Sequence, residues 1–149
     1  MAAQPKSTVE LRLPSRLGFE KVAMGTAAHV AKLMGFGDPR IEDLKTAVSE
    51  ACINAIEHGN KLQENLSVVV IMTLDATKLE VKVVDKGKGI TKKVTAPDID
   101  KKLHGEEAPR GLGLFLIENL VDEVEFVSES VEGSYTRLVI HLEKDTEGK

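Results

Sequence analysis

Polar residues able to do chemistry occur in three separated parts of the sequence. Glu50 and Asn54 lie four residues apart, and on a helix that spacing puts two side chains on nearly one face. Asp85 ends an apolar segment and is followed by glycines at alternate positions. Further along, the run 110–114 reads Arg-Gly-Leu-Gly-Leu and opens an apolar, helix-like segment. In this order the three groups supply a metal ligand, a carboxylate that reads a base and a cradle for phosphates, which together predict a nucleotide site.

The first group lies beside an apolar helical stripe. Asn is a poor residue for a helix interior, and its amide costs roughly 1–3 kcal/mol when it is buried without a partner. The side-chain oxygen of Asn54 is a hard neutral ligand that suits Mg²⁺, and Glu50 is placed one turn away to take a proton from an attacking hydroxyl or water. His58 extends the same stripe and is interpreted as a capping or structural residue. A solvated helix flank that ends at a Gly59 cap explains these residues equally well.

The second group consists of Asp85, Gly87 and Gly89. A carboxylate at the end of a strand can accept a hydrogen bond from the exocyclic amine of adenine, while glycines let the backbone pass close to the ring. Guanine has a carbonyl at that position, so the carboxylate would select adenine. A turn rich in Asp and Gly that closes a hairpin is the more common meaning of such residues.

Glycines of the third group lie immediately before and inside the first turn of a predicted helix. Free backbone amides and the helix dipole attract anions there, so Gly111 and Gly113 can cradle phosphates. Arg110 is a candidate contact for the terminal phosphate. Ordinary loop glycines and a solvated Arg are the alternative.

Composition excludes several classes of function. The net charge of -4 and the pI near 5.6 argue against a broad nucleic-acid surface, which would need clustered Lys and Arg. The single Cys52 excludes an intrachain disulfide. There is no basic-then-apolar leader and no apolar run near the length of a membrane span, so we expect a cytoplasmic protein without a membrane segment. Aromatic residues make up only 3%, which predicts an aliphatic core.

The pattern of apolar residues predicts the elements that must position these groups. Alternation or β-branched residues predict strands over 8–13, 66–74, 79–84, 124–130 and 136–142. Helical spacing predicts helices over 17–34, 38–59 and 112–121. Ser15 is expected to cap the first helix, and Asp38 to cap the second, with Pro39 at its first helical position. The charged, proline-containing segment 91–109 predicts a mobile loop.

This order of elements does not alternate as in doubly wound folds. We therefore expect an α+β fold, a two-layer α/β sandwich in which helices cover one face of a mixed, mostly antiparallel sheet. The length of 149 residues suits one domain, expected over 8–143, with loose termini at 1–7 and 144–149.

Three runs carry a resemblance to a known superfamily. They read SEACINAIEHGN (49–60), DKGKGI (85–90) and RGLGLFLIENLVDEV (110–124). These runs resemble the N, G1 and G2 boxes of the Bergerat-type, histidine-kinase-like ATPases, which include gyrase and sensor histidine kinases. Within that superfamily the chain most resembles the small anti-sigma-factor serine/threonine kinases of bacteria, and the likeness extends over 9–142.

The resemblance implies a role for each matching residue. It makes Glu50 the general base and Asn54 the Mg²⁺ ligand. It assigns Asp85 to adenine, with Thr136 supporting that contact through water. The segment 91–109 corresponds to the ATP lid. The other implied nucleotide-binding positions are Gly87, Gly89, Ile90, Arg110, Gly111, Leu112, Gly113 and Leu114.

The implied function is that of a serine protein kinase that uses ATP and Mg²⁺. It would phosphorylate an anti-anti-sigma partner of the STAS type and, in its other role, sequester a sigma factor. A homodimer is also implied, since the N-terminal strand offers a sheet edge. Two alternatives stay open: a binding module gated by ATP without catalysis, and the ATPase part of a split histidine kinase. For the latter, the sequence has no His in a separate helical hairpin, and His29 lies within the first predicted helix.

Overall fold

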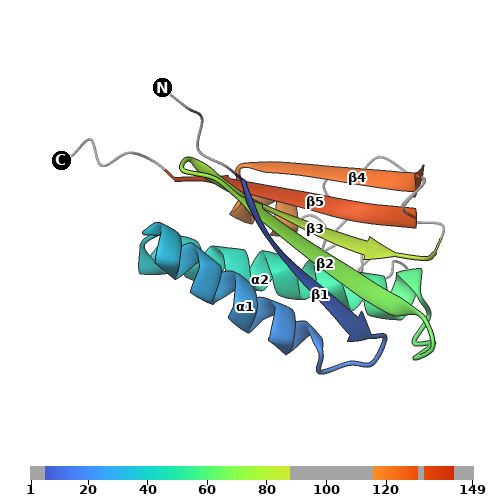
Figure 1. The fold of residues 1–149 in the computed structure, drawn as a ribbon. Coiled ribbons are helices and arrows are strands. Elements are labelled where there is room, and N and C mark those ends of the chain that lie inside the picture. Colours follow the sequence, from blue (N-terminus) through green and yellow to red (C-terminus); the bar gives the residue numbers. More distant parts are fainter. Residues whose placement is uncertain (1–5, 88–115, 131–132, 143–149) are drawn as a thin grey trace, which may run out of the picture.

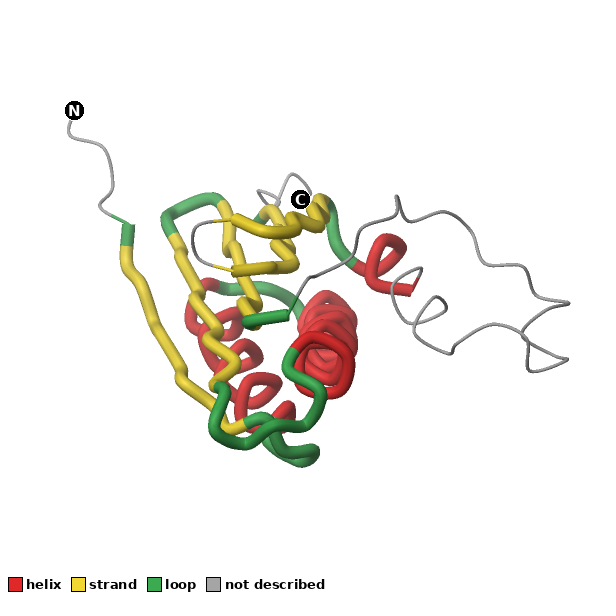
Figure 2. The backbone as a smooth tube through the Cα atoms, turned by 90° about the vertical axis from the view of Figure 1, so that its right-hand side faces the viewer, coloured by secondary structure: helices red, strands yellow, loops and turns green. Residues whose placement is uncertain are grey.

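Helices and strands form two layers in the computed structural model, which describes residues 6–87, 116–130 and 133–142. Figure 1 shows the helices on one face of the sheet, and Figure 2 shows both layers from a second direction. The sheet consists of β1 (Ser7–Pro14), β2 (Ser67–Leu74), β3 (Lys78–Asp85), β4 (Glu123–Ser130) and β5 (Gly133–His141). The helices are α1 (Glu20–Met34) and α2 (Asp38–Asn54), and a short π-helical turn, η1 (Ala55–Gly59), continues α2. The expected two-layer α+β fold is confirmed.

The strand order is β1-β2-β3-β5-β4, and all four pairings are antiparallel. We expected a mixed, mostly antiparallel sheet, and the described strands contain no parallel pair. β2 with β3 and β4 with β5 form the two predicted hairpins. After β3 the chain continues to β4 at the edge of the sheet, and β5 then returns to lie between β3 and β4. The described residues of the third predicted helix, 116–120, lie on that crossing.

The expected cap of the first helix is wrong. α1 begins at Glu20 after the N-cap residue Phe19, and no side chain bonds to the free amides of its first turn. Ser15 lies upstream and is fully buried, and its hydroxyl donates to the carbonyl oxygen of Leu66. The Ser15 hydroxyl is thus used in a contact with a residue distant in sequence, and it does not cap α1.

The second helix begins close to where the sequence predicts. Its N-cap residue is Gly37, so Asp38 is the first helical residue instead of the cap, and Pro39 follows in the first turn. Proline is well placed there because the first helical amides have no partner within the helix.

The predicted helix over 38–59 changes its winding after Asn54. Residues Ala55–Gly59 form the π-helical turn, and the Asn60 amide donates to the carbonyl oxygen of Ala55 at 2.7 Å. A π turn holds more residues than an α turn, so side chains after Asn54 rotate away from the α-helical face. Asn54 is accordingly buried while His58 is exposed, and the predicted stripe ends at Asn54.

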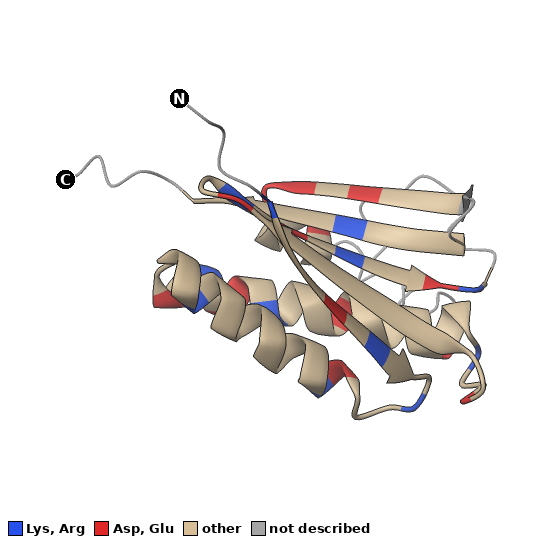
Figure 3. Cartoon of the chain, in the orientation of Figure 1, with Lys and Arg blue, Asp and Glu red and all other residues tan. Residues whose placement is uncertain are grey.

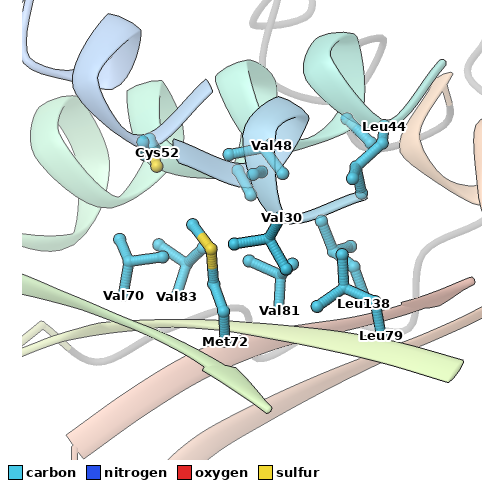
Figure 4. Packing of buried hydrophobic residues seen from close by; sticks show 14 of the residues in the cluster. Val30, Leu44, Val48, Cys52, Val70, Met72, Leu79, Val81, Val83 and Leu138 are labelled. Carbon is cyan, nitrogen blue, oxygen red and sulfur yellow. The ribbon is translucent and has the colours of Figure 1, made fainter. Parts of the chain in front are cut away.

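Aliphatic side chains from both layers form the core, as the low aromatic content predicts. Figure 4 shows Val30, Leu44 and Val48 of the helices facing the inner side of the sheet. Burial of each such side chain stabilises the fold by about 1.5–3 kcal/mol. The labelled sheet residues in this cluster are Val70, Met72, Leu79, Val81, Val83 and Leu138.

Cys52 lies in this core, and we expect its thiol to be unreactive in the folded protein. Its side chain is fully buried, and burial, with a smaller effect from the charge of Glu20, raises its pKa to about 12. The thiolate is the reacting form, so a maleimide at neutral pH should modify Cys52 only after unfolding. Mass spectrometry with and without guanidinium tests this expectation. Rapid modification without denaturant would contradict the packing.

The outer face of the sheet is charged, whereas the inner face is apolar. Figure 3 shows acidic and basic residues along β1, β3, β4 and β5. Arg137 Nε lies 2.7 Å from Glu80 Oε1, and Arg137 Nη1 lies 3.8 Å from Glu123 Oε1. His141 Nε2 lies 2.6 Å from Glu123 Oε2. Among the described residues, no helix is long and apolar enough to cross a membrane.

Candidate functional site

The end of α2 meets three strand ends at one end of the molecule. Figure 1 shows β1 and β3 ending, and β2 beginning, at the end of the sheet where η1 lies. The Asn60 side chain bonds to Ser15, Ser67 and Lys86, which follow β1, begin β2 and follow β3. The end of the helix that carries Glu50 and Asn54 therefore meets the end of the strand that carries Asp85.

Asp85 is the last residue of β3, and its side chain is only 8% exposed. Residues alternate along a strand, so Asp85 continues the helix-facing side that Val81 and Val83 begin. The amide of Gly87 donates to Asp85 Oδ1 at 2.8 Å. A buried carboxylate whose direction is set by a backbone amide is suited to read a polar group on a ligand.

Two glycines allow the carboxylate to lie where it does. A Cβ added at Gly59 would collide with the Asp85 carboxyl group, and one added at Gly87 would collide with the Gly59 backbone. Asp85 and Gly59 are both buried. Gly87 was predicted to let the backbone pass close to the ring of a base, and in the structure it packs against the Gly59 backbone. Gly59 was interpreted only as a helix cap.

Asn60 was not singled out by the sequence analysis. It is 1% exposed, and its amide oxygen accepts from the Lys86 amide at 2.7 Å. Its amide nitrogen donates to Ser15 Oγ at 2.8 Å and to the Ser67 carbonyl oxygen at 3.1 Å. The one available signal was its place directly after a helix-ending glycine, which is common for residues with no role in a site.

Asn54 is buried at 8% exposure, and its Nδ2 has no hydrogen-bond partner among the described residues. Leaving such a group unpaired costs roughly 1–3 kcal/mol, so the site suits a polar ligand. In the described ranges, no three or more His, Cys, Asp or Glu side chains are arranged to hold a metal ion. A cation beside Asn54 would therefore take most of its oxygens from a ligand or water, as Mg²⁺ does with nucleotide phosphates.

Glu50 lies one turn before Asn54 on α2 and is half-buried. Its carboxylate forms no hydrogen bond or ion pair with the described residues. A carboxylate with both oxygens available, next to a buried amide, can accept a proton from a bound hydroxyl. The base and metal-ligand roles of Glu50 and Asn54 stay predictions.

β5 brings two hydroxyl side chains to the helix-facing side beside Asp85. Ser134 is the register partner of Asp85, and Thr136 is that of Val83. Directly opposed residues of antiparallel strands point to the same face. The Ser134 hydroxyl donates to the Gly87 carbonyl oxygen at 2.8 Å. Thr136, the predicted support for the adenine contact, lies two residues farther along β5 on that face.

The remaining predicted positions lie outside the described residues. These are Gly89, Ile90, Arg110, Gly111, Leu112, Gly113 and Leu114, together with the predicted lid over 91–109. His29 is exposed on α1, and α1 packs against α2 within the same layer.

Comparison with known proteins adds independent findings. The profile of the histidine kinase-like ATPase domain matches residues 13–140, most of the chain. The chain is 31% identical over 143 residues to the serine-protein kinase RsbW of Bacillus thuringiensis and to that of Bacillus cereus. In each case the match covers 92% of this chain and 86% of the relative.

A solved structure shares the fold. The crystal structure of the RsbU and RsbW domains of a Mycobacterium tuberculosis protein superimposes with a TM-score of 0.64 and 19% sequence identity. The match covers 91% of this chain and 32% of that one, so the chain spans about a third of the larger protein.

Proposed function

This chain belongs to the histidine kinase-like ATPase family as a serine-protein kinase of the RsbW kind, and we propose that it phosphorylates an anti-anti-sigma partner and otherwise sequesters a sigma factor. The main support for a nucleotide site is the packing of the Asp85 carboxyl group against Gly59. That contact joins the end of α2, with Glu50 and Asn54, to the end of β3. Catalytic and base-reading residues then share one site.

Adenine is the base that this site suits. The Asp85 carboxylate accepts a hydrogen bond from the exocyclic amine of adenine, and Thr136 supports the contact through water. Guanine offers a carbonyl oxygen instead, which a carboxylate repels. Gly87, which the family resemblance places along the base pocket, packs against the backbone of Gly59 beside the Asp85 carboxylate.

Asn54 is the protein ligand for Mg²⁺. Its buried, unpartnered amide fits this role, because rotation of the amide presents its oxygen to a cation or its nitrogen to a phosphate oxygen. Mg²⁺ bound there would draw negative charge from the phosphates of ATP.

Glu50 acts on the protein substrate. Its carboxylate takes the proton of a serine hydroxyl as the serine oxygen forms a bond to the terminal phosphorus. The bond from that phosphorus to the bridging oxygen breaks, and ADP leaves with that oxygen. Gly111 and Gly113 cradle the phosphates, with Arg110 at the terminal one. These three assignments rest on the sequence resemblance.

The partners follow from the same premise. The serine belongs to a STAS-type anti-anti-sigma protein, and the sigma factor binds when that partner is phosphorylated. We place one ATPase domain over 8–143 and the protein in the cytoplasm. β1 is a sheet edge, which supports a homodimer formed through that strand.

Replacement of Asp85 by Asn tests the nucleotide assignment. The amide cannot accept from adenine as a carboxylate does, so we expect ATP affinity to fall by about 10–100-fold while GTP affinity does not fall. Isothermal titration calorimetry with both nucleotides measures the change. Asp43→Asn is the matched control, because Asp43 lies near the start of α2, away from the Asp85 corner. Equal ATP affinity in Asp85→Asn and the native protein would refute the assignment.

A further inference from the structure

The buried side chain of Asn60 makes three hydrogen bonds. Its nitrogen donates to Ser15 Oγ at 2.8 Å and to the Ser67 carbonyl oxygen at 3.1 Å, and its oxygen accepts from the Lys86 amide at 2.7 Å. These partners come from the ends of three strands. The β1–β2 ladder reaches Pro14 and Ser67, whereas the β2–β3 ladder ends at Val69 and Val84. The Asn60 side chain therefore joins the segment after β3 to the start of β2 beyond the end of their ladder.

The direction of this amide follows from its partners. The Ser67 carbonyl can only accept and the Lys86 amide can only donate, so exchange of the amide oxygen and nitrogen would break both contacts. The Ser15 hydroxyl already donates to the Leu66 carbonyl oxygen, which leaves it an acceptor for Asn60. A carboxylate at position 60 would lose both donated bonds, so the position requires an amide.

The bond to Lys86 links Asn60 to the base-reading carboxylate. Lys86 directly follows Asp85, and the next amide, that of Gly87, donates to Asp85 Oδ1. On the other side, Gly59 directly precedes Asn60 and lies against the Asp85 carboxyl group. Asn60 thus holds together the two backbone segments that define where the carboxylate points.

We propose that Asn60 is a positioning residue for adenine recognition: through the Lys86 amide it sets the direction of the Asp85 carboxylate without touching the nucleotide. The inference rests on the proposed function, in which Asp85 reads adenine. It adds that selectivity for adenine depends on a side chain at the end of η1, outside the nucleotide contacts.

A residue that only stabilises the fold would have a different signature. Its loss would lower the melting temperature and leave the folded protein with an unchanged preference between bases. A positioning residue changes the ratio of ATP to GTP affinity in the folded protein. The ratio therefore separates the two roles.

The test compares Asn60→Ala with Asn65→Ala, whose side chain is exposed in the segment that follows η1. Circular dichroism first sets a temperature at which each variant is folded, and calorimetry then gives the dissociation constants for ATP and GTP. We expect Asn60→Ala to reduce the ATP-over-GTP preference by about tenfold, through weaker ATP binding, because one hydrogen bond that orients a charged group is lost. Phosphotransfer at saturating ATP should stay within about twofold of the native rate, and Asn65→Ala should match the native protein throughout.

An unchanged ratio in folded Asn60→Ala would overturn the inference while leaving the proposed function intact. If Asn60→Ala does not fold, Ser15→Ala decides the question. It removes one of the two acceptors of the Asn60 nitrogen, and we expect a smaller loss of preference, about threefold. An unchanged ratio there would again overturn the inference. A native protein that does not prefer ATP to GTP would overturn both the proposed function and this inference.

Discussion

Glu50→Gln is expected to slow phosphotransfer to the partner serine by about 10²–10⁴-fold while ATP affinity changes by less than about twofold. Gln has the size and shape of Glu, but its amide cannot take the proton of the serine hydroxyl. Glu50 makes no hydrogen bond or ion pair with the described residues, so the substitution disturbs no described contact. The loss should therefore fall on the rate of transfer and not on nucleotide binding.

Transfer of labelled phosphate from ATP to a purified STAS-domain partner measures this rate, and calorimetry measures ATP affinity. Glu42→Gln is the control on the same helix, where the exposed carboxylate pairs with Lys45 at 3.4 Å. If Glu50→Gln keeps the native rate, Glu50 is not the base. If the variant loses transfer but still regulates the sigma factor in a reconstituted assay, the chain acts as an ATP-gated binding module.

Gly59→Ala is expected to reduce ATP affinity at least as much as Asp85→Asn does, and also to lower the free energy of unfolding by about 1–3 kcal/mol. The added methyl group collides with the Asp85 carboxyl group, which is buried and cannot move aside without breaking its bond from the Gly87 amide. Displacement of the carboxylate removes base recognition, and the overpacked corner costs stability.

Gly25→Ala provides the matched control for this substitution. Gly25 lies within α1, and a Cβ there meets no atom within 4 Å. Because Ala favours a helix interior over Gly, Gly25→Ala should raise stability by about 0.5–1 kcal/mol and leave ATP affinity unchanged. Urea unfolding and calorimetry on both variants give the comparison. Native ATP affinity in Gly59→Ala would show that the carboxylate position does not matter for binding.

Local sequence patterns predicted the elements well because burial repeats with the period of each element. The alternation in β1 and the β-branched run in β2 give strands within one residue of those predicted. β3 also extends by one residue at each end, to Lys78–Asp85, which makes Asp85 part of the strand instead of its flank. Spacing on α2 placed Glu50 and Asn54 one turn apart, as the structure has them.

Caps and winding were predicted less well because they depend on distant partners. Ser15 was expected to cap α1, yet its hydroxyl donates to the Leu66 carbonyl oxygen and accepts from the Asn60 amide nitrogen. The helix over 38–59 was expected to be α-helical throughout, yet its last five residues form a π-helical turn. The Asn60 amide closes that turn by donating to the Ala55 carbonyl oxygen. Neither contact leaves a periodic trace in the sequence.

The sequence by itself determined the α+β fold, the aliphatic core and the residue types that suit a nucleotide. These properties depend on local spacing and side-chain chemistry, which a sequence records directly. Only the tertiary structure decided that Gly59 packs against the Asp85 carboxyl group and that Asn60 ties the backbone directly after Asp85 to Ser15 and Ser67. Such contacts join residues at distant positions, and their geometry exists only once the helix end and the strand ends pack together.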